Sequence, residues 1–145
     1  MASLFAPGNA VTAGKLNGAW TSYSTAWTAT ISNPALGNGS LLSYWARLGN
    51  MMAISISLTM GSTTTYGSGA WLFSLPVASL SATVTPFGMG EVWGLDSGTD
   101  FYNGNVGLFT TTTIFLDSEN SWFATSPFTW GTNDSLVATG WFPIA

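Results

Sequence analysis

Charge is the first thing that this sequence has little of. Only 6% of its 145 residues are charged, against roughly 25% in an ordinary globular domain. Six carboxylates outweigh Lys15 and Arg47 and give a net charge of -4, so the chain has no basic patch that could bind a phosphate backbone. We therefore expect no nucleic-acid partner. Because charge repulsion is so weak on such a surface, we expect assembly with copies of the same chain.

Histidine and cysteine are absent altogether. Their absence removes the commonest general base, the thiolate nucleophile, the usual zinc ligands and any disulfide. Asp117 and Glu119 remain as a pair of carboxylates, but the turn-like stretch "DSENS" cannot place them on two sides of a sugar, as glycoside hydrolysis needs. We interpret both as solvated turn residues and predict a protein that is not an enzyme and binds no cofactor.

Long apolar runs and helical periodicity are also missing. No stretch reaches the roughly 18 apolar residues that a membrane helix requires. The first twenty residues lack the basic and apolar parts of an export signal. No apolar pattern with a helical period persists, because glycine, serine and threonine interrupt every stretch. We predict no membrane partner, no export signal and very little helix.

Strand patterns, by contrast, are plentiful. From Met52 to Met60 large apolar side chains alternate strictly with small ones, so that Ile54, Ile56 and Leu58 share one predicted core face. The preceding "LLSYWARLG" is a partner strand, joined through Gly49 and Asn50, because both residue types tolerate the positive φ of hairpin turns. We predict a β-hairpin here.

A short strand with three large side chains on one face follows the turn-like segment 63–69. Its core residues are Trp71, Phe73 and Leu75, and Pro76 ends it by removing a backbone donor. Further candidate strands lie at 20–31, 91–95, 101–109, 110–116, 122–125 and 136–142. Eight or nine short strands, spaced by about 8 to 12 residues, predict an all-β fold. We expect an antiparallel β-sandwich, of which a jelly roll is one form, over residues 20–145.

Residues 1–19 differ from the rest, since proline and glycine prevent a regular element while several apolar side chains recur. We predict an extended N-terminal arm that docks on a neighbouring subunit or in a crevice of its own domain. Its expected assembly contacts are Leu4, Phe5, Pro7, Val11, Leu16 and Trp20.

Arg47 and the pair Asp96 and Asp100 can each be interpreted as structural or as functional. Arg47 is expected to form an ion pair or a cation–π contact with a tryptophan, with ligand recognition as the alternative. Asp96 and Asp100, in "LDSGTDFYNGN", resemble part of a calcium loop, but the closing glutamate is missing. We favour an ordinary hairpin turn there, in which the aspartates accept backbone hydrogen bonds.

The eight tryptophans could form a sugar-binding platform or belong to the core and to subunit interfaces. Those on an alternating strand face, such as Trp71, favour the core. Trp20, Trp27 and Trp141 have the weaker claim to a core position.

Three stretches carry a recognisable pattern. Near the start, "FAPGNAVTAGKLN" contains Gly8, Thr12, Ala13, Leu16 and Asn17 at fixed spacing. In the middle, "LGNG", an aromatic-x-Arg-x-Gly segment, "GSTT" and "GAWLFSLP" follow one another between 36 and 76. Near the end stands "PFTWGTNDSLVATGWF". Together these stretches resemble small virion proteins and fibre domains of tailed phages, especially phages that infect actinobacteria.

The resemblance implies a non-enzymatic structural protein, commonly trimeric, made in the host cytoplasm and displayed on the virion exterior. One sandwich with an arm has no shaft or coiled coil of a complete tail fibre. We therefore expect a homotrimeric capsid decoration protein that contacts the major capsid protein or other virion proteins and stabilises the shell. A tail-fibre tip or minor tail module that binds a receptor such as a host surface glycan, and a carbohydrate-binding module, remain as alternatives.

Overall fold

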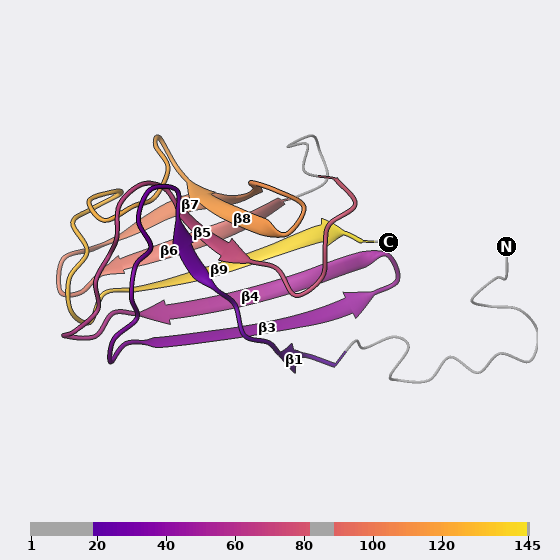
Figure 1. Ribbon diagram of the computed structural model, residues 1–145, viewed down its shortest axis with the longest axis horizontal. Helices are drawn as coiled ribbons and strands as arrows, with labels where there is room; N and C mark the ends of the chain where they lie inside the picture. Colours follow the sequence, from indigo (N-terminus) through magenta and orange to yellow (C-terminus); the bar gives the residue numbers. More distant parts are fainter. Residues whose placement is uncertain (1–18, 82–88, 145) are drawn as a thin grey trace, which may run out of the picture.

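The computed structural model describes residues 19–81 and 89–144 of the chain (Figure 1). Within these residues the regular elements are nine β-strands. Their bounds are β1 Thr21–Ser22, β2 Trp27–Ala29, β3 Ser40–Leu48, β4 Met51–Thr59, β5 Trp71–Ser74, β6 Met89–Asp96, β7 Asp100–Leu108, β8 Thr113–Asp117 and β9 Ser135–Pro143. The predicted all-β class is confirmed.

All nine strands belong to one antiparallel sheet, in the order β1-β3-β4-β9-β6-β7-β8-β5-β2 (Figure 1). The sheet curls, so that residues from strands far apart in this order pack on one core. The hydrogen bonding runs through a single continuous sheet. The structure is therefore a curled sheet, and the two separate sheets expected of a sandwich or jelly roll are not present among the described residues.

The predicted strand over 20–31 is wrong as one element, because the segment divides between the two ends of the sheet. β1 pairs with β3, and β2 pairs with β5. Between them, the Tyr23 amide donates to the Ser43 carbonyl over 3.0 Å, and the Thr25 hydroxyl donates to the Ser74 carbonyl over 2.8 Å. Residues 21–29 therefore tie the two ends of the curled sheet together, which a period-2 pattern alone does not predict.

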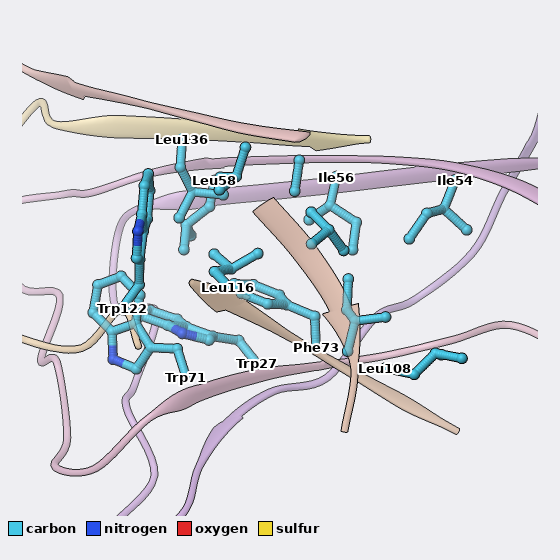
Figure 2. Packing of buried hydrophobic residues seen from close by; sticks show 14 of the residues in the cluster. Trp27, Ile54, Ile56, Leu58, Trp71, Phe73, Leu108, Leu116, Trp122 and Leu136 are labelled. Carbon is cyan, nitrogen blue, oxygen red and sulfur yellow. The ribbon is translucent and has the colours of Figure 1, made fainter. Parts of the chain in front are cut away.

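The hairpin of β3 and β4 is confirmed, with Gly49 in the turn at φ 59°. The side of the sheet that faces the core, here called the inner face, carries Ile54, Ile56 and Leu58, each at most 1% exposed. Figure 2 shows these three side chains pointing from β4 toward Phe73 and Leu116. Because alternate strand residues point to opposite faces, the predicted core face is confirmed.

The short strand β5 is confirmed as well. Trp71 and Phe73 are both 0% exposed, and Leu75, just beyond the strand, is partly buried against the same core. Trp27, which on sequence grounds had a weaker claim to a core position, is in fact only 8% exposed. Its ring packs edge-to-face with that of Trp71, with 5.0 Å between the ring centroids, and is parallel to that of Phe73, with 6.5 Å between the centroids. The pairing of β2 with β5 brings these rings together.

The predicted strand over 122–125 is also wrong. Phe123 and Ser126 exchange backbone hydrogen bonds of 3.1 and 3.0 Å, which close a tight turn instead of a strand. Trp122 is nevertheless fully buried, and its indole Nε1 donates to the Ser118 hydroxyl over 3.3 Å. The Trp122 amide donates to the Leu116 carbonyl of β8, and the Trp122 carbonyl accepts from the Trp71 amide of β5, both over 2.9 Å. Packing of the buried indole and these two backbone bonds together hold this segment in place.

Candidate functional site: a polar groove and an apolar face

The solvent-facing side of the sheet, here called the outer face, carries two different surfaces. The strand register decides which residues share each of them. One row across the sheet contains Leu42, Ser57, Val137, Trp93 and Asn103 as successive cross-strand partners. Apolar residues thus occupy the β3 end of this row, and Asn103 on β7 makes the other end polar.

The polar part is hollowed. A groove of about 360 Å³, here called the polar groove, is lined by Glu91, Trp93, Asn103, Gly104, Asn105, Ser118 and Glu119. A neighbouring hollow of about 340 Å³ shares Asn103, Ser118 and Glu119 with it and adds Tyr102 and Asn120. The two hollows therefore lie next to each other, near β7 and the turn that follows β8.

Cross-strand pairing places the groove's side chains. Trp93 on β6 is the direct partner of Asn103 on β7, and Glu91 is the direct partner of Asn105. On the far side, Asn105 pairs with Asp117 at the end of β8. Directly paired residues on one face lie about 5 Å apart at Cβ, so one aromatic ring, two amides and two carboxylates converge here.

Two glycines pack against Trp122: Gly104, which lines the groove, and Gly94 on β6. A Cβ on Gly104 would lie 2.6 Å from the Asp117 carbonyl oxygen and 3.1 Å from the Trp122 ring. A Cβ on Gly94 would lie 3.0 Å from the same ring. Only glycine allows this close approach, so the buried indole supports the strands that carry the groove.

Ser118 accepts from the Trp122 indole, but the amides and carboxylates of the groove make no side-chain hydrogen bond in the described part of the chain. Two asparagines elsewhere hydrogen-bond to the backbone through their side chains. Asn33 accepts from the Ala29 amide over 3.1 Å, and Asn38 accepts from the Thr63 amide over 3.0 Å. By contrast, among the side-chain hydrogen bonds of residues 19–81 and 89–144 none involves Asn103, Asn105 or the two groove glutamates. These groups are available to a ligand.

Asp134, in the sequence "GTND" before β9, is a buried carboxylate. It is only 4% exposed. Its Oδ1 accepts from the Ser97 amide over 2.8 Å, and its Oδ2 accepts from the Gly131 amide. The carboxylate thus joins two loops at one end of the sheet, and its role is structural.

Most predicted assembly contacts lie outside the described residues: Leu4, Phe5, Pro7, Val11 and Leu16, with the arm to which they belong. Trp20 is described and is 56% exposed, as the weaker claim to a core position predicts. Trp141 is likewise exposed, at 51%. The sequence did not single out Trp93, although it is 52% exposed.

Arg47 lies exposed near the end of β3, and its Nε donates to the Gly49 carbonyl over 2.8 Å. This bond braces the hairpin turn. The ion pair or cation–π contact expected from the sequence stays a prediction.

Asp96 and Asp100 are the last and first residues of β6 and β7, at the base of a hairpin turn with Gly98 at φ 82°. The Asp100 carboxylate accepts from the Phe101 amide over 2.8 Å. Among residues 19–81 and 89–144 there is no group of three or more acidic side chains that could hold a metal ion. In the same ranges, no helix is long and apolar enough to cross a bilayer.

The apolar part of the outer face lies over β3, β4 and β9. We call it the apolar outer face, and its exposed side chains are Leu42, Tyr44, Leu48, Met51, Val137 and Trp141. Their rows adjoin one another, because Leu48 pairs with Met51 and Leu42 pairs with Ser57, which pairs in turn with Val137. Contiguous exposed apolar surface of this kind commonly marks a site of association.

The described residues thus form an all-β domain with a polar groove and an apolar face on one side of its sheet. The chain is 30% identical over 108 residues to the Mu-like prophage FluMu defective tail fiber protein of Haemophilus influenzae. That similarity covers 72% of this chain and 17% of the relative, so the chain spans a minor part of the relative's length. No family model matches the chain, and no solved structure matches it.

Proposed function

We propose that this chain is a non-enzymatic structural protein of a phage tail fibre. The observation that carries the proposal is the 30% identity to a prophage tail fibre protein over most of this chain. The resemblance of the sequence to virion proteins of tailed phages points the same way, and an all-β domain is compatible with it. The comparison lends no support to a link with phages of actinobacteria in particular.

The relative also bears on the position within the virion. Its name refers to the tail, whereas nothing in the comparison favours the capsid decoration role that we expected from the sequence. We therefore prefer the tail-fibre alternative to the head. In this role the domain would lie at the virion exterior, where a polar groove is accessible to a receptor.

A non-enzymatic role is supported by the chemistry at hand. The whole sequence lacks histidine and cysteine. Its buried carboxylate, Asp134, accepts two backbone hydrogen bonds and lies away from the groove lining. The groove's two carboxylates accompany amides and an aromatic ring, a composition suited to holding a ligand.

We further propose that the chain associates with copies of itself, as a homotrimer, through the apolar outer face. Six exposed apolar side chains adjoin one another there, among small neutral residues such as Ala53, Ser55 and Ser57. In a cyclic trimer two different parts of the surface meet between neighbouring copies, and an apolar face that extends over three strands can supply one or both of them. Because the face carries almost no charge, like charges would not oppose that contact.

Labelling of intact virions tests the proposed function. An antibody raised against this chain should decorate the tail fibres of phage particles that contain it, as seen by electron microscopy, and should not decorate particles that lack it. Label on the capsid would overturn the tail assignment in favour of the decoration role. Particles that bind no antibody, although the chain is produced during infection, would contradict any place in the virion.

A further inference from the structure

We propose that the polar groove binds an uncharged saccharide, with Trp93 as the surface on which a sugar ring stacks. The inference deepens the proposed function, and it rests on that function only for the setting in which the saccharide is met. Binding of the sugar itself depends on the groove alone.

Trp93 is placed for stacking. Its side chain is 52% exposed although it lies in the middle of β6, between β9 and β7. A half-exposed indole on the outer face of the sheet offers an apolar ring face with a polar N–H at its edge. The apolar C–H face of a pyranose ring complements such a surface. Because Trp93 lines a groove rather than a convex patch, it can cover one side of a bound ring while neighbouring side chains reach the sugar's edge.

Two asparagines next to Trp93 could hydrogen-bond to a sugar. Asn103 and Asn105 flank Gly104 inside β7, although asparagine and glycine are disfavoured in strands and typical of turns. The close packing under Gly104 explains the glycine, but nothing in the core requires the two asparagines. Residues that break a local preference without a structural reason commonly belong to functional sites.

The chemistry of these side chains fits hydroxyl groups. An amide offers both donors and acceptors, and a carboxylate offers only acceptors. Sugar hydroxyls donate and accept, so a hydroxyl can donate to Glu91 or Glu119 while it accepts from Asn103 or Asn105. None of these four side chains is occupied by a hydrogen bond within residues 19–81 and 89–144.

The negative charge of the groove disfavours anionic ligands. The groove lining contains two carboxylates, Glu91 and Glu119, and no lysine or arginine. Asp117, the cross-strand partner of Asn105, adds a third negative charge close by. Sulfated, phosphorylated or carboxylated sugars would meet repulsion with no cation to offset it. The groove therefore favours a neutral or N-acetylated saccharide over an anionic one.

Isothermal titration of the full chain tests the inference. The uncharged probes are maltohexaose, cellohexaose, mannohexaose and chitohexaose, and the anionic probe is hexagalacturonate. We expect saturable binding of at least one uncharged probe, with affinity about tenfold lower or worse in Trp93→Ala and in Asn103→Ala. Phe109→Ala is the matched control, because Phe109 is an aromatic residue that is 50% exposed and lies outside both the groove lining and the apolar outer face.

The control should bind within about twofold of the parent chain, and near-ultraviolet circular dichroism shows whether each variant keeps its fold. If Trp93→Ala does not fold, Asn103→Ala and Asn105→Ala carry the test. The inference is overturned if no uncharged probe binds saturably, if hexagalacturonate binds best, or if Phe109→Ala weakens binding as much as the groove variants.

Neutralising the groove gives a second readout that a merely structural role would not move. The double variant Glu91→Gln and Glu119→Gln should raise the affinity for hexagalacturonate relative to the parent chain, because repulsion is removed while the amides still hydrogen-bond. No change in that relative affinity would contradict the charge argument.

Failure of the inference and failure of the proposed function are distinguishable. Saccharide binding lost in Trp93→Ala, together with antibody label on the capsid, would support the groove and overturn the tail assignment. Label on the tail fibres without saturable binding of any uncharged probe would support the tail assignment and overturn saccharide binding in the groove.

Discussion

The two faces of the sheet can be compared residue by residue along one strand pair. In β4, the inner residues Ile56 and Leu58 are fully buried, and in β3 the outer residues Leu42 and Tyr44 are 54% and 42% exposed. Both faces are rich in apolar side chains, so hydrophobicity alone does not decide which one becomes the core. The direction in which the sheet curls decides it, and the outer apolar side chains are left for partners.

The largest effect should separate a core ring from an exposed side chain. Phe73→Ala should lower the free energy of unfolding by about 3 to 5 kcal/mol, because the ring is fully buried and its loss leaves a cavity. Leu42→Ala, on the outer face, should change it by about 0.5 kcal/mol or less. Urea denaturation, followed by tryptophan fluorescence, measures both. Similar losses in the two variants would abolish the distinction between the faces.

A second contrast is between two carboxylates. Asp134→Ala should cost about 2 to 3 kcal/mol, because the amides of Ser97 and Gly131 lose a charged acceptor in a buried setting. Glu91→Ala should leave the free energy of unfolding nearly unchanged, since the groove carboxylate supports no backbone group. The same denaturation experiment compares them. A larger loss at Glu91 would mean that the groove serves stability instead of binding.

The segment that joins the two ends of the sheet should be sensitive to alkaline pH. Burial raises the pKa of Tyr23 to about 12 from the usual 10.0, and its hydroxyl donates to the Ser74 carbonyl over 3.3 Å. Burial, and then the charge of Asp134, also raise the pKa of Tyr66.

A raised folded-state pKa means that the folded chain keeps its proton longer than the unfolded chain. The associated stability is therefore full below about pH 10 and declines as the pH rises toward about 12. Tyr23→Phe should reduce that decline by about 1 kcal/mol, since the phenol is partly solvated, while Tyr66 retains its share. Unfolding free energies measured at intervals from pH 8 to 12 give the comparison, and equal declines in the two chains would refute it.

The smallest effect on stability should accompany a large effect on association. Leu42→Ser with Tyr44→Ser should change the unfolding free energy of a single copy by about 0.5 kcal/mol or less. The same pair of changes should weaken the trimer about tenfold or more, because it removes exposed apolar area from the proposed interface. Light scattering over a dilution series measures the mass. A parent chain that stays monomeric at high micromolar concentration would refute the proposed interface.

Some elements were predictable because their cause is local. The alternation in Met52–Met60 and the Gly49–Asn50 turn are properties of neighbouring residues, and both predictions are confirmed. Segment 20–31 was not predictable in the same way. Its residues are compatible with a strand throughout, but the hydrogen-bond partners on Ser43 and Ser74, which divide it, come from distant strands.

The candidate groove was even less accessible to sequence reasoning. Trp93, Asn103 and Glu119 are distant along the chain, and no spacing rule links them. Their convergence depends on the β6–β7 register and on the turn after β8. One signal was present nonetheless: "NGN" is typical of a turn, yet it lies within a strand pattern.

The amino-acid sequence by itself determined the all-β class, the alternating core of β4 and β5, and a surface with almost no charge. These properties follow from residue type and from the period of two along a strand, which act over a few residues. Only the tertiary structure decided that one sheet closes through residues 21–29, that Trp27 is buried, and that Trp93 faces a groove. Each of these depends on which distant strands become neighbours, and the strand order, rather than local propensity, sets that.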